Sequence, residues 1–199
     1  MSVCSLDYQI NPSPSALAGT GGAYPLHLEG TVLLQDGRRI AIRLIRPDDA
    51  GALQTLVARS HAQDVRFRFL HTMKHLPDRL AARLSQIDYA REMAFVAIDP
   101  DDPAAIIGVA RLISDSDGMQ AEYSILLRRD HQGEGLGYAL MKCLIDFARS
   151  RGIVLVYGDV LNENEPMLSM CADLGFRRSA HGADPSVQRV VLHVKAKAD

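Results

Sequence analysis

The stretch Arg128-Arg-Asp-His-Gln-Gly-Glu-Gly-Leu-Gly137 decides the fold of this chain. Its core is the motif Gln132-x-x-Gly135-x-Gly137, and a helical pattern follows it directly. Glycines let a backbone pass close to a ligand, and the unpaired N–H groups of a helix start attract anions. The motif therefore predicts a loop that holds a pyrophosphate. Three glycines alone fit a strand-to-helix turn without a ligand equally well, but neither dinucleotide-binding spacing nor a Gly-Lys-Ser/Thr phosphate loop is present.

The helix after this loop has the clearest periodic pattern of the chain. Its apolar residues recur at spacings of three and four and predict an amphipathic helix that begins near Leu136 and ends at Gly152. Weaker signals predict a helix over 47–60, two helical segments between 61 and 87, and a short helix over 166–174 that Gly175 closes. The apolar positions of the main helix are Leu136, Ala139, Leu140, Cys143, Leu144 and Phe147.

Short runs of β-forming residues separated by turn signals predict a sheet. The turn Asp36-Gly37 joins two runs as a β-hairpin, and short turns join the next three runs as an antiparallel meander. Two more strands follow the main helix. The predicted strands cover residues 31–34, 40–44, 92–98, 105–113, 120–127, 153–160 and 187–194.

Length and composition indicate one domain. The 199 residues are 47% hydrophobic, which suffices for one well-buried core but leaves two domains marginal. Residues 1–24 are rich in Pro, Gly, Ser and Ala without any period, so we predict a disordered tail followed by one domain over 25–197.

Charge and cysteine usage exclude several classes of function. The formal net charge is −2, so no overall field draws the chain to nucleic acid or to an anionic membrane. No Lys or Arg precedes Arg38, and no apolar run is long enough to span a bilayer, which predicts a cytoplasmic location. Cys4, Cys143 and Cys171 are far apart and form no C-x-x-C pair, so we predict free thiols, with neither a disulfide framework nor a zinc site. The oligomeric state stays open.

Several segments outside the loop match a known family. Together with Gln132-x-x-Gly135-x-Gly137, Asn164 and Gly175-Phe176, they resemble the GNAT superfamily of N-acetyltransferases, and more closely the bacterial protein lysine acetyltransferases of the Pat type. The resemblance covers residues 24–195 and implies an α/β (α+β) fold with a mixed, largely antiparallel twisted sheet flanked by helices. These segments are Ile42-Arg-Leu-Ile-Arg-Pro-Asp-Asp-Ala50, Arg68-Phe69, Ile87-Asp-Tyr-Ala-Arg-Glu-Met-Ala94, Ile107-Gly-Val-Ala-Arg111, Ala121-Glu122, Val160-Leu-Asn-Glu-Asn164 and Met167-Leu168.

The resemblance also implies a site for acetyl-CoA as co-substrate. It places the pyrophosphate on the loop, the pantetheine along the preceding strand, and Asn164 near the cofactor. It further implies strand N–H groups, freed near Ile125 to Leu127 where the pairing splays, that stabilise negative charge on the thioester oxygen. The implied contacts are Gln132, Gly133, Glu134, Gly135, Leu136 and Gly137 in the loop, and Ser124, Ile125 and Leu126 in the strand.

Amine acetylation needs a neutral nitrogen, whereas a lysine amine has a pKa of about 10.4. A general base must take the proton, and Glu122 is the matching position in the family. The alternative is an exposed strand carboxylate that pairs with an arginine. One position departs from the pattern: many GNAT enzymes have a tyrosine seven residues after the equivalent of Asn164, as acid for the leaving thiolate, and this chain has Cys171, which we interpret as a core residue. Arg66 and Arg68 are expected to anchor the covering helices to acidic residues.

Three functions remain open from the sequence. The first is acetylation of a lysine side chain on a protein, with an acyl-CoA synthetase as candidate acceptor. The second is acetylation of a small amine, which acidic residues lining the cleft would favour. The third is a non-catalytic sensor of acetyl-CoA, against which the presence of Glu122 argues.

Overall fold

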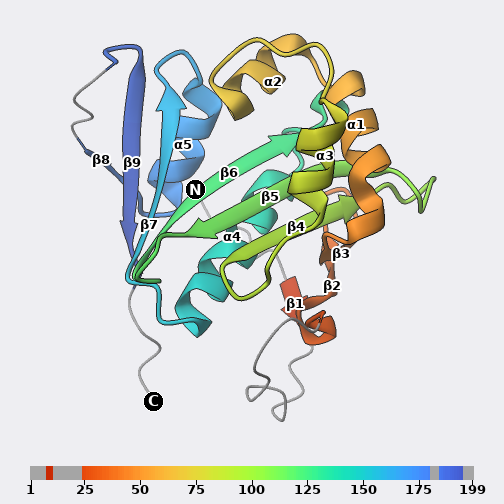
Figure 1. The fold of residues 1–199 in the computed structure, drawn as a ribbon, viewed down its shortest axis with the longest axis horizontal. Coiled ribbons are helices and arrows are strands. Elements are labelled where there is room, and N and C mark those ends of the chain that lie inside the picture. The colour runs from red at the N-terminus through yellow and green to blue at the C-terminus, as the bar shows by residue number, and fades with distance from the viewer. Residues whose placement is uncertain (1–7, 11–23, 180–183, 195–199) are drawn as a thin grey trace.

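The computed structural model describes residues 8–10, 24–179 and 184–194, whose strands form one sheet (Figure 1). These strands are β1 (Tyr8–Ile10), β2 (Gly30–Leu33), β3 (Arg39–Leu44), β4 (Glu92–Ile98), β5 (Ile106–Ser114), β6 (Gln120–Leu127), β7 (Leu155–Leu161), β8 (Arg177–Ser179) and β9 (Val187–His193). Their order is β1-β2-β3-β4-β5-β6-β7-β9-β8. All neighbours are antiparallel except β6 and β7, which run parallel. The predicted mixed, largely antiparallel sheet is confirmed.

Five α-helices of the described residues flank the sheet, close to where the periodic patterns predict them. A 3-10 turn at Pro47–Asp49 precedes the first, which reflects the Pro-Asp-Asp start of that segment. The helices are α1 (Ala50–Arg59), α2 (Ala62–Phe69), α3 (Asp78–Ser85), α4 (Leu136–Ser150) and α5 (Glu165–Asp173).

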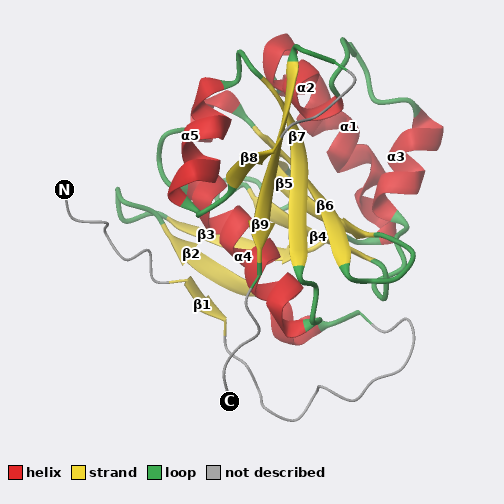
Figure 2. Ribbon diagram, turned by 90° about the vertical axis from the view of Figure 1, so that its left-hand side faces the viewer, coloured by secondary structure: helices red, strands yellow, loops and turns green. Residues whose placement is uncertain are grey.

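The helices cover the two faces of the sheet in separate groups. In Figure 2, α4 and α5 lie on one side of the sheet and α1, α2 and α3 lie on the other. Side chains alternate between these faces along a strand, so the central strand β4 is buried on both. Met93 and Phe95 are in the core beneath α4, whereas Ala94 and Val96 are in the core beneath α1. The sheet therefore separates two apolar cores.

The hairpin and the main helix follow their sequence signals. β2 pairs with β3, and Gly37 in the turn between them has φ +88, a conformation that glycine adopts without steric cost. In α4, the predicted apolar stripe faces the core: Leu136, Leu140 and Leu144 are fully buried. Burying this stripe against the sheet fixes the position of the glycine loop in front of the helix.

Two short strands were not predicted. The prediction that residues 1–24 form a disordered tail is wrong for Tyr8–Ile10, which pairs with β2 as strand β1. The rest of the predicted tail up to residue 23 lies outside the described residues, as does Cys4. β8 pairs antiparallel with the edge of β9, and both new strands have only three residues. Cys143 and Cys171 are thiols buried in the core, as predicted.

Candidate active site

The site begins where β6 and β7 separate. Their parallel pairing covers only Gln120–Glu122 on β6 and Leu155–Tyr157 on β7, although both strands continue. Gly158, the next residue on β7, lies against the ring of Tyr123, and a side chain at this position would overlap that ring. The aromatic ring thus lies at the point where the two strands part. Beyond it, the edge of β6 that faces β7 has no strand partner among the described residues.

Backbone N–H groups of β6 point into this gap. The N–H of Arg128 donates to the carbonyl oxygen of Ile107 on the β5 side at 2.9 Å. Hydrogen-bonded and non-bonded residues alternate along an antiparallel pair, so residues 126 and 124 also face β5. The N–H groups of Ile125 and Leu127 therefore point away from β5, toward the gap. These N–H groups lie in the splayed region in which the family resemblance implies hydrogen-bond donors for the thioester oxygen.

A small cleft of about 60 Å³ occupies the same gap. Glu122 and Ser124 point to the face of α1 to α3, whereas Ala121 and Tyr123 point to the opposite core, as their alternation predicts. Glu122 is solvent-exposed, and it forms no ion pair within the described part of the chain. Of the alternative interpretation, an exposed carboxylate paired with an arginine, the exposure is present and the ion pair is absent among the described residues. The cleft is lined by Phe67, Arg68, Leu70, Glu122, Tyr123, Ser124, Ile125, Asp159, Val160, Asn164 and Met167.

Asn164 lines the cleft and also begins helix α5. Its side-chain oxygen accepts a hydrogen bond from the N–H of Met167 at 3.3 Å, which makes it the N-cap of the helix. Asn164 is buried, so the cap orients α5 at the wall of the cleft. Asn164 therefore lies at the cleft, as expected, and its side chain caps helix α5 there.

The glycine loop, residues 132–137, lies at the end of β6 and in front of α4. Gly133 has φ +79 and Gly135 has φ +91, a left-handed conformation that side chains rarely adopt. A Cβ added at either glycine would meet no atom within 4 Å, so the space beside the loop is open. The first N–H groups of α4 have no acceptor within the helix. This open cradle of N–H groups fits a pyrophosphate.

Not every predicted contact presents its side chain to this space. Gln132 donates from Nε2 to the carbonyl oxygen of Leu127 at 3.0 Å and so ties the loop to the end of β6. Leu136 is fully buried beneath the loop, and Leu126 is buried in the core beneath α1. For the two leucines, only the backbone remains to face a ligand. Ser124 and Ile125 both line the cleft.

Two charged residues that line the cleft, Arg68 and Asp159, were not predicted as site residues. Arg66 forms an ion pair with Glu163, as expected for an anchor, but Arg68 turns into the cleft toward Glu122. Burial, together with the nearby Arg111, lowers the pKa of Arg68 to about 10, against the opposing effect of Glu122. Asp159 accepts two hydrogen bonds from Arg189, both at 2.8 Å. The sequence feature that could have identified Asp159 is its place as an acidic residue within an otherwise apolar strand.

Cys171 lies in the core on the far side of Tyr123. Its sulfur is 3.0 Å from the phenolic oxygen of Tyr123, and burial raises the pKa of the Cys171 thiol. Burial likewise raises the pKa of Tyr123. The interpretation of Cys171 as a core residue is confirmed by its burial.

Within the described residues, no group of His, Cys, Asp and Glu side chains has an arrangement that could hold a metal ion. The helices of that part of the chain also include none with the length and apolarity needed to cross a bilayer.

A mixed sheet that splits beside a glycine loop, with a carboxylate at the point of separation, is the arrangement that the resemblance to acyl-CoA-dependent acetyltransferases implies. The family comparison agrees: the model described as "Acetyltransferase (GNAT) domain" matches residues 39–177. The chain belongs to this family and is an N-acetyltransferase.

Individual relatives extend this result. An acetyltransferase of Pseudomonas aeruginosa is 33% identical over 161 residues, which cover 80% of this chain and 85% of the relative. The crystal structure of the GNAT domain of S. lividans PAT superposes with a TM-score of 0.79 at 25% identity, covering 86% of this chain and 99% of that domain. A spermidine N-acetyltransferase from Vibrio cholerae, solved with CoA and spermine, has a TM-score of 0.62 at 19% identity over 78% of this chain and 95% of its own.

Proposed function

We propose that the chain transfers an acetyl group from acetyl-CoA to a lysine side chain of a protein, with an acyl-CoA synthetase as the first candidate acceptor. The observation that carries the acyl transfer is the gap between β6 and β7, which begins at Glu122 and leads to the glycine loop. The protein acceptor is supported by the Pat-type sequence segments and by the likeness to the GNAT domain of S. lividans PAT.

In this proposal acetyl-CoA supplies an activated thioester, and the chain binds and orients it. The N–H groups beside Gly133 and Gly135 hold the pyrophosphate, while Ser124 and Ile125 lie along the pantetheine. The N–H of Ile125 points into the gap and stabilises charge on the carbonyl oxygen. Glu122 is the residue that accepts the proton.

The chemistry is a direct transfer. Glu122 takes a proton from the lysine ammonium, and the neutral nitrogen attacks the thioester carbonyl carbon. A C–N bond forms, the C–S bond breaks, and the electron pair leaves with the CoA sulfur. The nitrogen loses its second proton to the CoA thiolate, which gives a neutral amide and CoA thiol. A thiolate is a fair leaving group, so the absence of the family tyrosine at Cys171 is compatible with turnover.

A small amine is the second candidate acceptor. Both Glu122 and Asp159 line the cleft, and acidic groups attract cationic amines. The likeness to the spermidine N-acetyltransferase from V. cholerae concerns the fold alone. Arg68 in the same cleft opposes a polycation, because it is a half-buried positive charge beside Glu122.

Intact mass spectrometry tests the two acceptors side by side. A purified acetyl-CoA synthetase is incubated with this protein and acetyl-CoA, and we expect the mass of one acetyl group to be added. The matched control replaces the modified lysine by arginine and should stay unmodified. If spermidine or free lysine is acetylated with a far higher kcat/KM than any protein tested, the small-amine function is correct. If neither kind of amine is acetylated although CoA binds, the chain is a sensor.

A further inference from the structure

An acidic residue stands in the middle of the loop that is proposed to hold a pyrophosphate. Glu134 lies between Gly133 and Gly135, the two positions with open space beside them. A carboxylate beside a bound pyrophosphate repels it, and at partly buried positions this repulsion is weakly screened. The structure must therefore either direct this charge elsewhere or neutralise it.

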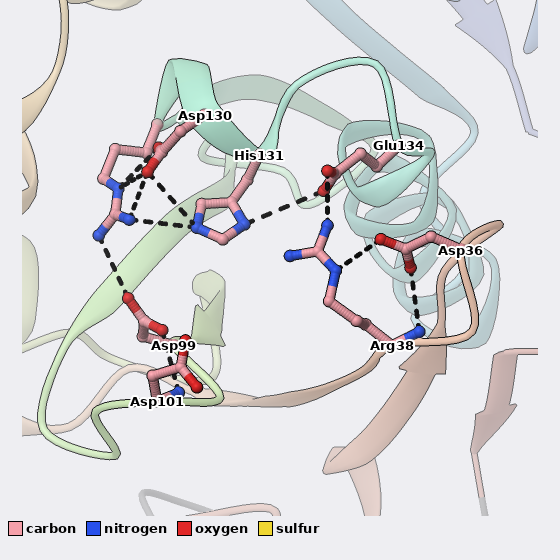
Figure 3. A network of polar contacts seen from close by, with 8 residues as sticks. Asp36, Arg38, Asp99, Asp101, Asp130, His131 and Glu134 are labelled. Atoms are coloured by element: carbon pink, nitrogen blue, oxygen red, sulfur yellow. Dashed lines mark hydrogen bonds and ion pairs between the residues drawn. The ribbon is translucent and has the colours of Figure 1, made fainter.

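The carboxylate of Glu134 is turned toward the β2–β3 hairpin (Figure 3). Its Oε1 lies 2.5 Å from Nη2 of Arg38, which is on the hairpin just before β3. Asp36 holds the same guanidinium from the other side, with its Oδ2 2.5 Å from Nε of Arg38. Arg38 is thus fixed by its own hairpin and extends to the loop.

The second oxygen of Glu134 faces His131. Oε2 is buried, makes no hydrogen bond within the described residues, and lies 4.0 Å from Nδ1 of His131. The other ring nitrogen, Nε2, is 3.2 Å from Nη2 of Arg128. A guanidinium only donates, so Nε2 is the acceptor in this contact. Nδ1 also makes no hydrogen bond within the described residues, and Figure 3 shows Glu134 between His131 and Arg38.

We propose that Arg38 is a positioning residue of the acyl-donor site. It draws the Glu134 carboxylate away from the open side of the glycine loop and neutralises its charge, so that the phosphates of CoA meet backbone N–H groups without a competing anion. His131 supports the same orientation from the 3-10 turn just before the loop. This role rests on the proposed use of acetyl-CoA. In it, Glu134 contributes only backbone atoms to the ligand site, and its side chain does not contact the ligand.

Calorimetric titration with CoA, without any acceptor, tests the role of Arg38. Arg38→Ala should raise the Kd for CoA on the order of tenfold, because one uncompensated charge then lies beside the phosphates. Arg38→Gln keeps a polar side chain but removes the positive charge, and it should give a similar loss. Glu134→Gln in the Arg38→Ala background should restore the affinity, because it removes the repelling charge. Arg39→Ala, which removes a neighbouring exposed charge from the same hairpin, should leave the Kd unchanged.

Restoration of the CoA affinity by Glu134→Gln distinguishes a positioning role of Arg38 from other roles. An unchanged Kd in both Arg38 variants would overturn the proposal. A raised Kd that Glu134→Gln does not restore would also overturn it, because Arg38 would then act directly on the phosphates or on the fold of the hairpin. The loss should diminish as salt is added, since a charge effect is screened and a packing defect is not. Failure of the wild-type protein to bind CoA would contradict the proposed co-substrate itself, and with it any role of Arg38 in holding it.

Discussion

The phenolic oxygen of Tyr123 lies 3.0 Å from the sulfur of Cys171, and both side chains are buried. This contact joins β6 to α5 at the place where related enzymes have a tyrosine on the helix. The hydroxyl here belongs to the strand, and the helix contributes the sulfur.

Cys171→Ala should keep most of the transfer activity and lower stability. Truncation leaves the Tyr123 hydroxyl buried without its partner, which costs about 1–3 kcal/mol. Denaturant unfolding measures the loss, and kcat should stay within a few-fold of wild type. Because removal of both partners avoids the unpaired hydroxyl, Tyr123→Phe with Cys171→Ala should cost less than the sum of the single changes. A loss of activity beyond about a hundredfold in folded Cys171→Ala would assign the thiol to acid catalysis.

Gly158→Ala should destabilise the fold and reduce activity together. A methyl group there overlaps the ring of Tyr123, so the ring or β7 has to move, and overpacking of this kind costs about 1–3 kcal/mol. The movement also displaces the strands at the start of the gap. Gly51→Ala is the matched control, because nothing lies within 4 Å of a Cβ at Gly51 in α1, and alanine favours a helix by about 0.5–1 kcal/mol. Equal stability of the two variants in thermal unfolding would contradict the role given to Gly158.

The glycine loop could be predicted because its signal is local. The motif, the strand before it and the amphipathic helix after it lie in one stretch of sequence, and burial of that helix fixes the loop. The strand β1 (Tyr8–Ile10) could not be predicted in the same way. Three residues carry no measurable period, and the strand exists only through its pairing with β2.

The charged residues of the site also divide into those that the sequence could predict and those that it could not. The prediction of Glu122 came from the family resemblance, whereas the approach of Arg68 to Glu122 depends on how α2 packs against β6. The contact of Arg38 with Glu134 likewise joins a hairpin to a loop far along the chain. Such contacts are tertiary, and no local pattern specifies them.

Gly135→Val should abolish binding of CoA. The left-handed backbone at Gly135 disfavours a branched side chain, and the side chain would fill the open space beside the loop. In wild type, a hundredfold excess of ligand over its Kd should stabilise the fold by about 2.7 kcal/mol, visible as a rise in Tm. The variant should show no rise.

Gly118→Val is the control for backbone strain. Gly118 also has positive φ and open space, but it lies in the turn between β5 and β6. It should lower the Tm of the free protein and keep the rise with acetyl-CoA. If acetyl-CoA leaves the Tm of the wild type unchanged at saturation, the co-substrate assignment fails.

Glu122→Gln should leave the Kd for CoA intact and lower kcat by roughly 10² to 10⁴, the usual size of a general-base contribution. The defect should shrink as the pH rises, because a larger fraction of the acceptor amine is then neutral without help from a base. Asp159→Asn is the discriminating control, since it removes the other carboxylate of the cleft. Both oxygens of Asp159 already accept hydrogen bonds from Arg189, whereas Glu122 is exposed and forms no ion pair among the described residues, so Glu122 is the better placed acceptor of a proton. Asp159→Asn should therefore lower kcat far less than Glu122→Gln. The opposite order, measured as pH profiles of kcat for both variants with the same acceptor, would make Asp159 the base.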